Sequence, residues 1–170
     1  GISAAMLRRL ILPVCLIVLA TPAAADTRYL AFDAADRVTN ALTRGVTLEV
    51  ERGLFGAVSV RRIISTGARG SATLSRGGPD QARAALAPGA SETAVYSIAP
   101  EGDGRGLSRA LCPGAVDTFL VLGRIRAGRP MVMQAAGRWP DGRFRHCTTL
   151  SYVWRGEWSL PPRGAIPESP

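Results

Sequence analysis

The stretch Asp117–Trp154, DTFLVLGRIRAGRPMVMQAAGRWPDGRFRHCTTLSYVW, decides the fold of this chain. It holds three runs typical of β-strands, at residues 117–126, 130–136 and 143–154, rich in Val, Leu, Met and aromatic residues. The connectors between them, Ala127-Gly128-Arg129 and Pro140-Asp141-Gly142, are short and suit tight turns. Connectors of this length join antiparallel neighbours, so the stretch predicts a β-meander.

The same reasoning extends toward the N-terminus. Val46, Leu48 and Val50 alternate with polar residues, the period of a half-buried strand. Further strands are expected at residues 26–30, 57–66, 71–76 and 93–99, and short helices at 34–42, 79–86 and 107–112. Arg155-Gly156 predicts a tight hairpin leading into residues 157–160. The sequence thus predicts a mostly β fold: a single antiparallel β-sandwich or partly closed barrel with two or three short helices.

Residues 1–25 have the features of an N-terminal extension and cleavable signal peptide. Arg8 and Arg9 precede an apolar run over residues 10–20, and Ala23-Ala24-Ala25 supplies small residues for cleavage. The run is too short to cross a bilayer, so no transmembrane helix is expected after cleavage. We therefore expect a periplasmic or secreted protein. Its richness in Ala, Gly, Pro and Arg favours a Gram-negative bacterium with a GC-rich genome.

The remaining chain divides into a mostly β domain at residues 26–160 and a disordered, proline-rich tail at 161–170. Cys15 lies in the leader, which leaves two cysteines in the domain, Cys112 and Cys147. An even number of cysteines in an exported chain predicts a disulfide between them.

Charge is unevenly distributed along the chain. All 21 basic residues are arginine, and the net charge is +8, most of it in the final third. If Phe119, Val121 and Ile125 point inward on the first of the three runs, and Phe144 and Leu150 on the last, the strand alternation turns the neighbouring arginines outward. We then expect one outer face suited to an anionic surface, since guanidinium groups form paired hydrogen bonds with phosphate and carboxylate. Ordinary solvated arginines are the alternative. The residues of this predicted patch are Arg124, Arg126, Arg143 and Arg145.

No residue pattern specifies catalysis. His146 is the only histidine. Strand alternation predicts that it shares the inward face of Phe144 and Leu150, at the edge of the core and with a hydrogen-bonded ring. Glu49 and Glu51 share a strand face, where salt bridges to Arg61 or Arg62 across a hairpin are the expected role. The sequence shows no nucleophile elbow, no set of metal ligands and no phosphate-binding glycine loop, so no catalytic residue, metal or cofactor is predicted.

These observations favour a non-enzymatic envelope protein that binds an envelope protein partner or an anionic lipid or polysaccharide. Nucleic acid is not expected as a partner, because export separates the protein from it and no recognition module is present. Two alternatives stay open: an unrecognised periplasmic hydrolase or hydrolase inhibitor, and a carrier of a small apolar ligand. The first needs a pocket with converging titratable groups, and the second needs an open barrel interior.

Overall fold

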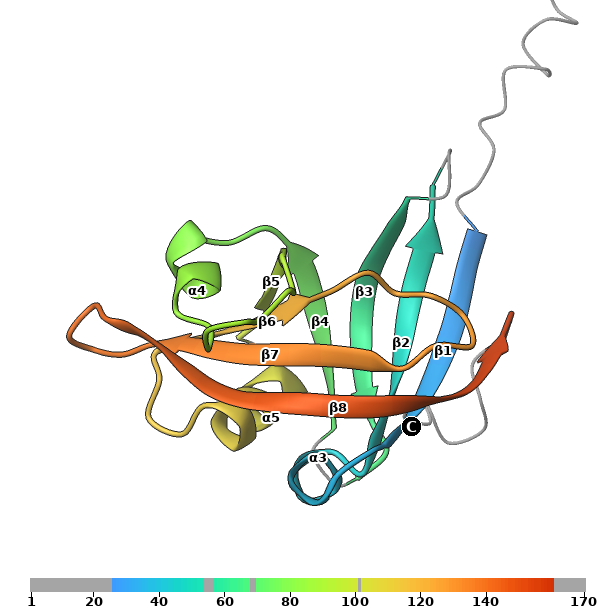
Figure 1. Ribbon diagram of the computed structural model, residues 1–170, viewed down its shortest axis with the longest axis horizontal. Coiled ribbons are helices and arrows are strands. Elements are labelled where there is room, and N and C mark those ends of the chain that lie inside the picture. Colours follow the sequence, from blue (N-terminus) through green and yellow to red (C-terminus); the bar gives the residue numbers. More distant parts are fainter. Residues whose placement is uncertain (1–25, 54–56, 68–69, 101, 161–170) are drawn as a thin grey trace, which may run out of the picture.

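The computed structural model describes residues 26–53, 57–67, 70–100 and 102–160. The predicted leader and proline-rich tail lie outside these residues. Eight antiparallel strands form one closed barrel (Figure 1). They are β1 (Asp26–Ala34), β2 (Gly45–Arg52), β3 (Val58–Ser65), β4 (Ser71–Arg76), β5 (Ala94–Ile98), β6 (Asp117–Leu122), β7 (Met131–Arg138) and β8 (Phe144–Trp158).

Each strand pairs with the next along the chain, and β8 returns to pair with β1. The closing pair runs from Tyr29 opposite Trp158 to Ala34 opposite Tyr152. The predicted mostly β fold is therefore confirmed, and of the two expected architectures the structure is a barrel, closed rather than partly closed. Its strand connections alternate between the two ends, because every consecutive pair is antiparallel.

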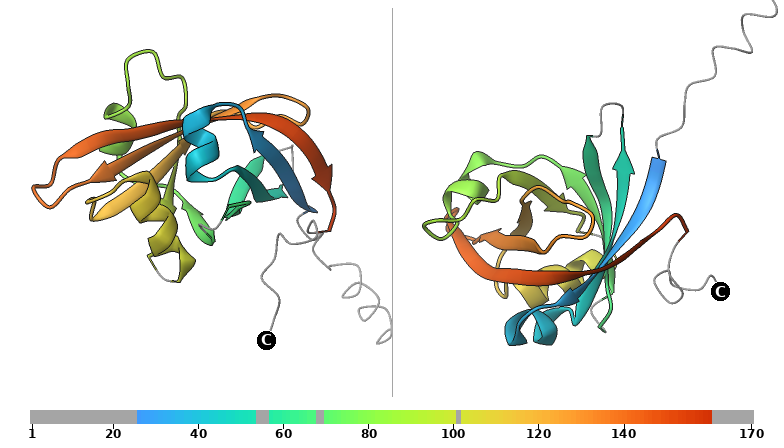
Figure 2. Two further views of the ribbon diagram at one scale, coloured as in Figure 1. Left: turned by 90° about the horizontal axis from the view of Figure 1, so that it is seen from below. Right: turned by 45° about the vertical axis from the view of Figure 1, so that its right-hand side comes forward.

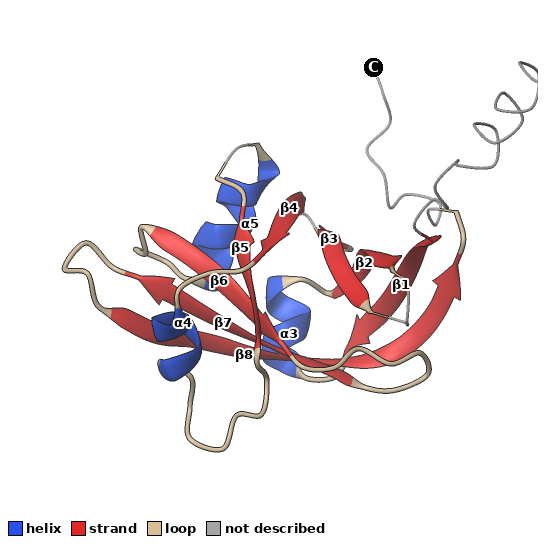
Figure 3. Ribbon diagram, turned by 90° about the horizontal axis from the view of Figure 1, so that it is seen from above, coloured by secondary structure: helices blue, strands red, loops and turns tan. Residues whose placement is uncertain are grey.

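Three short helices lie in the described parts of the connections (Figures 1 and 3). Helix α3 (Arg37–Leu42) follows β1, α4 (Asp80–Ala84) follows β4, and α5 (Asp103–Leu111) follows β5. Helices α3 and α5 lie at one end of the barrel and come forward when the molecule is seen from below (Figure 2, left). Helix α4 belongs to the other end and packs against the outer side of the sheet, where it contacts β6, β7 and β8.

Helix α5 closes its end of the barrel. Leu107 and Leu111 are buried in the same core cluster as the inward-facing strand residues. Cys112, the residue after the helix, is bonded to Cys147 on β8, with the two Cα atoms 5.3 Å apart. The predicted disulfide is thus confirmed. It fixes helix α5 to the barrel wall, and the described residues at the opposite end of the barrel line a pocket, called the mouth below.

Large side chains fill the interior of the barrel. Tyr96, Tyr152, Phe32, Met133 and Leu48 are among the fully buried ones. They come from strands all around the barrel, as period-2 alternation requires. Burial of their apolar area stabilises the fold by about 1.5–3 kcal/mol for each such side chain, before conformational entropy is subtracted.

The predicted inward face of β6 is wrong. Leu120 and Leu122 belong to the core cluster, whereas Phe119 faces outward and packs against Phe144, with ring centroids 6.1 Å apart. Val121 shares the parity of Phe119 and is also fully buried. Both faces of this strand are therefore apolar and covered, so hydrophobicity alone does not distinguish inside from outside.

A β-bulge on β8 reverses the predicted face of His146. Thr148 pairs with Ala135 and His146 pairs with Ala136, so Cys147 is the extra residue between them. Ala135 faces the interior and Ala136 the outside. His146 consequently lies on the outer surface of the sheet instead of sharing the inward face of Leu150, although its ring is hydrogen-bonded as expected.

The predicted hairpin at Arg155-Gly156 is also wrong, because β8 continues through these residues to Trp158. Gly156 pairs with Ala31 of β1, and the ring of Trp158 lies where a side chain on Gly156 would be. This glycine accommodates a tryptophan on a long closing strand and makes no turn.

Two other sequence expectations concern local structure. The predicted cross-strand pairs are present: Arg61 lies 3.2 Å from Glu51 and Arg62 lies 3.8 Å from Glu49. Helix α3 begins later than expected, because Asp33 and Ala34 still belong to β1. The capping residue is therefore Asp36, whose carboxylate accepts a hydrogen bond from the Thr39 backbone N–H at 2.8 Å.

Candidate functional site at the barrel mouth

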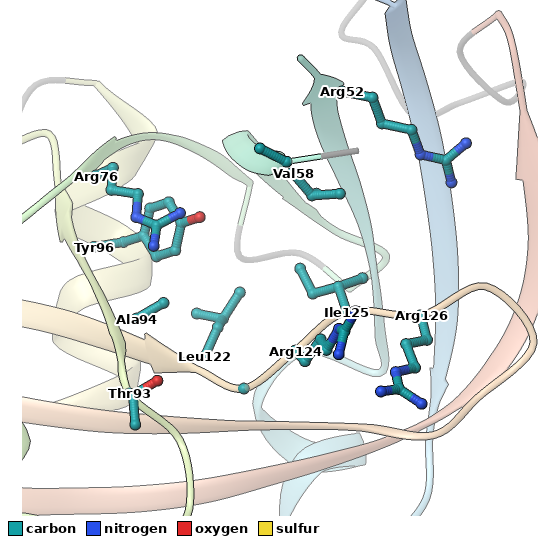
Figure 4. Close-up of a pocket in the computed structure, with 12 residues that line it drawn as sticks. Arg52, Val58, Arg76, Thr93, Ala94, Tyr96, Leu122, Arg124, Ile125 and Arg126 are labelled. Atoms are coloured by element: carbon teal, nitrogen blue, oxygen red, sulfur yellow. The ribbon is translucent and has the colours of Figure 1, made fainter. Parts of the chain in front are cut away.

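A pocket of about 630 Å³ opens at the mouth of the barrel (Figure 4). Its lining comes from the end of β2, the start of β3, the end of β4, the start of β5 and the β6–β7 connection. These segments meet because alternate connections of the meander fall at the same end. The pocket contains four arginines above a small apolar floor. The arginines are Arg52, Arg76, Arg124 and Arg126.

Strand alternation places these arginines at the mouth. Arg52 follows the inward-facing Val50 by two positions, and Arg76 follows the inward-facing Leu74 by two. Arg124 has the same relation to Leu122, the last residue of β6, and so lies two residues beyond the end of the strand. An inward position in the middle of the barrel requires an apolar side chain. The same parity at the open end reaches water and accepts a charge.

The floor of the pocket is apolar and fixed. Its side chains include those of Val58, Ala94, Leu122 and Ile125, with the ring of Tyr96. The Tyr96 hydroxyl accepts a hydrogen bond from the Val60 backbone N–H at 3.2 Å, across the barrel interior. This bond holds the ring in place, and the pocket ends at the packed core below it.

The mouth arginines differ in their partners. Arg52 lies 3.4 Å from Glu157, which also pairs with Arg28 at 2.7 Å. The Arg76 guanidinium lies over the Tyr96 ring, 5.8 Å from its centroid, a cation–π contact. Arg124 and Arg126 are exposed.

Carboxylates are scarce around the pocket. Within the described part of the chain, no carboxylate lies within ion-pair distance of Arg76, Arg124 or Arg126. Glu157 is the only one that pairs with a pocket-lining arginine in that same part. The mouth therefore carries a concentrated positive charge, which low-dielectric walls focus toward the opening.

The predicted arginine patch is divided between two ends of the barrel. Arg124 and Arg126 lie at the mouth, in the β6–β7 connection, whereas Arg143 and Arg145 lie at the β7–β8 hairpin beyond the other end of β7 (Figure 1). The expectation that all four share one outer face is wrong, because successive connections of a meander alternate. Arg145 pairs with Asp141 at 3.1 Å and lies over the Trp139 ring.

Arg52 and Arg76 line the pocket but were not among the binding residues predicted from the sequence. The available signal was their position: each ends a strand, two residues after a buried inward-facing residue. The pattern becomes informative only once the strands are known to close into a barrel, because closure alone brings the ends of β2, β4 and β6 around one opening.

A second polar group of residues lies on the outer face of the sheet. The buried Glu92 carboxylate accepts hydrogen bonds from Gln134 Nε2 at 2.6 Å and from the Ser91 hydroxyl at 3.1 Å. Gln134 Oε1 is 2.8 Å from His146 Nε2 and accepts a hydrogen bond from the Thr149 hydroxyl at 2.7 Å. Because Gln134 donates to a carboxylate, its oxygen faces the histidine, so His146 Nε2 carries a proton.

This network links the β4–β5 connection to β7 and β8, and its geometry is that of a structural tie. The residue beside His146 Nε2 is an amide, whereas a general base is oriented by a carboxylate or similar group in contact with a nucleophile. In the described residues, no group of three or more His, Cys, Asp or Glu is arranged to hold a metal ion.

A further cavity of about 490 Å³ lies between α5, the end of β5 and the start of β6. Among its lining residues are Ile98, Val116 and Phe119, with Arg105 and Arg109 at the helix. No helix in the described ranges is long and apolar enough to cross a membrane.

Comparison of the chain with known protein families, with curated proteins and with solved structures finds no match. Function therefore has to be inferred from the chemistry of the barrel mouth.

Proposed function

We propose that this is a non-enzymatic binding protein whose barrel mouth holds an anionic ligand through its carboxylate or phosphate groups. The protein acts in the periplasm or outside the cell, in keeping with the leader-like sequence at residues 1–25 and with the Cys112–Cys147 disulfide. A soluble anion and an anionic lipid headgroup present the same chemistry to the mouth.

The observation that carries this proposal is that the guanidinium groups of Arg124 and Arg126 have no carboxylate partner within the ranges that the structure describes. Both line the pocket, and neither has a carboxylate partner in the described residues, although acids elsewhere pair with arginines such as Arg61 and Arg138. An incoming anion gains charge-assisted hydrogen bonds from them without displacing an existing partner. Arg76 adds a third unpaired cation held over Tyr96.

The pocket lining also favours binding over catalysis. Its polar side chains are arginines and the hydroxyls of Thr93 and Tyr96. Tyr96 is buried and accepts the Val60 hydrogen bond. The described lining thus contains cations but no carboxylate, histidine or cysteine to serve as a general base or activated nucleophile. The filled interior argues against an enclosed chamber for an apolar ligand.

Calorimetric titration of the purified chain tests the proposal. Pyrophosphate is the soluble probe, and vesicles of phosphatidylglycerol, compared with phosphatidylcholine vesicles, are the lipid probe. We expect binding to at least one anionic probe at low salt, weakening as ionic strength rises. Binding to pyrophosphate alone indicates a soluble ligand, and binding to phosphatidylglycerol vesicles alone indicates a headgroup.

A matched pair of double variants locates the site. Arg124→Ser with Arg126→Ser removes two charges from the mouth, and Arg37→Ser with Arg143→Ser removes two exposed charges from the other end. Loss of binding in the first pair only supports the proposal. Equal losses in both pairs, or no binding by the unaltered chain to any anionic probe, overturn it.

A further inference from the structure

We infer that the mouth selects a small ligand with two anionic groups separated by an apolar segment. This inference rests on the proposed binding of anions at the mouth and adds the class of ligand. It follows from the order of charged and apolar positions around the opening.

Charged and apolar side chains alternate from strand to strand at the mouth. Arg52, Arg76 and Arg124 extend the inward faces of β2, β4 and β6. The two strands between them present Val58 on β3 and Ala94 on β5. One strand separates each pair of arginine-bearing strands. The arginines also lie at different levels, because Arg76 pairs with Tyr96 on β5, whereas Arg124 lies two residues beyond Leu122, which pairs with Ala94. The cations therefore form separate positions with an aliphatic position between each pair.

Figure 4 shows the consequence in space. The Arg76 side chain lies on one side of the pocket, and those of Arg52 and Arg126 lie on the other. The apolar side chains of Val58, Leu122 and Ile125 lie between them. A single compact anion occupies one side only and leaves the opposite arginine without a partner.

The apolar floor gives the middle of such a ligand a complementary surface. Leu122 is buried beneath the opening, and Ile125 is half-buried beside it. Methylene groups laid over these side chains leave water at the same time as the terminal anions pair with arginine. The volume of about 630 Å³ is within the range of small-molecule sites, so a short dianion fits where a folded partner does not.

The test compares ligands with the same chain and one or two anionic groups. Suberate is titrated against octanoate, and octane diphosphonate against octyl phosphonate, into the full chain by calorimetry. We expect the dianion of at least one series to bind about tenfold or more tightly than its monoanion, because a second charge-assisted pair forms. Octanoate and octyl phosphonate keep the chain length constant.

A second comparison separates bridging from general attraction to positive charge. Succinate and butyrate are the short dianion and monoanion. The affinity gained on lengthening succinate to suberate should exceed that gained on lengthening butyrate to octanoate, since only suberate spans the floor. Arg76→Gln should remove most of the advantage of suberate while octanoate binding changes little. Thermal melting confirms that this variant remains folded.

Two results overturn the inference while leaving the proposed function intact. One is equal affinity of dianions and monoanions in both series, with pyrophosphate or phosphatidylglycerol still bound. The other is a dianion advantage that survives Arg76→Gln in the folded variant. Absence of binding by every anionic probe overturns the inference and the proposed function together.

Discussion

The hydroxyl oxygen of Tyr96 on β5 accepts a hydrogen bond from the backbone N–H of Val60 on β3, across the interior of the barrel. Val60 lies next to the bulge on β3, where Arg61 is the extra residue opposite β2. The bond therefore satisfies a backbone donor at an irregular point of the ladder, and it fixes the ring that forms part of the pocket floor.

Tyr96→Phe should destabilise the protein by about 1–3 kcal/mol, because it leaves a buried N–H group without a partner. Tyr152→Phe is the matched control, since the Thr43 hydroxyl that it releases still donates to the Thr39 carbonyl. We expect this control to cost about 0.5–1.5 kcal/mol. Urea unfolding of both variants measures the difference, and equal costs would show that the Val60 hydrogen bond contributes little.

The disulfide should account for a large part of the stability. It closes a loop with a sequence separation of 35 residues, for which chain entropy gives about 3–4 kcal/mol. We expect Cys112→Ser with Cys147→Ser to lower the free energy of unfolding by this amount, and reduction of the unaltered protein to have a similar effect. Chemical denaturation with and without reductant measures it. An unchanged midpoint under reducing conditions contradicts the prediction.

Two glycines of α5 should respond oppositely to the same substitution. A Cβ atom on the buried Gly104 would overlap the carbonyl oxygen of Ala99, which belongs to the backbone and cannot rotate away. Gly106 is exposed in the same helix. Gly104→Ala should therefore destabilise the protein, whereas Gly106→Ala should stabilise it by about 0.5–1 kcal/mol through helix propensity. Thermal melting distinguishes the two signs.

Glu157→Gln should strengthen anion binding. The change removes the carboxylate that pairs with Arg28 and Arg52, so the positive charge at the mouth increases. The ion pairs are partly exposed, and we expect the loss of stability to be about 1 kcal/mol or less. Asp33→Asn, which breaks the Arg155 pair at the other end of the barrel, is the control with the same charge change. Calorimetry with pyrophosphate should show tighter binding for Glu157→Gln only.

The N-cap of α3 should contribute stability that depends on pH. The hydrogen bond from the Thr39 backbone N–H lowers the pKa of Asp36. A lowered pKa in the folded state means that the stabilisation is present above the unfolded value of about 3.9 and is lost as pH falls through the folded value. Asp36→Asn keeps a capping group that does not titrate. The advantage of the unaltered protein over this variant should shrink below about pH 4, as measured by thermal melts across pH.

The sequence predicted what depends on local pattern. Alternation at Val46, Leu48 and Val50 gave β2, and the predicted strand at residues 71–76 matches β4. It did not predict what depends on closure. The hairpin expected at Arg155-Gly156 is a plausible local turn, yet these residues continue the strand because β1 supplies a partner for it. Only a tertiary contact distinguishes the two outcomes.

The residues of the candidate site likewise divide into those predicted from local pattern and those brought together only by closure of the barrel. Arg124 and Arg126 were predicted from local charge and strand pattern as binding residues, which stays a prediction. Their grouping with Arg143 was wrong, because the end of the barrel at which a connection lies depends on topology. Arg76 was missed because its position at the end of a strand becomes informative only once the strands are known to close into a barrel. A bulge of one residue, such as that at Cys147, also reverses the face of every following side chain, and no periodic pattern reveals it in advance.

The pairing of β8 with β1 has a consequence for how the molecule assembles. Its partners are separated by up to 129 residues, as for Arg28 and Glu157, whereas every other strand pair joins consecutive strands. Closing so long a loop costs more chain entropy than pairing consecutive strands, so the pairing of β8 with β1 is expected to form last. Until then β1 and β8 are unprotected edges able to recruit strands from other molecules. A polypeptide truncated before Tyr152 keeps those edges permanently, and aggregation is its expected fate.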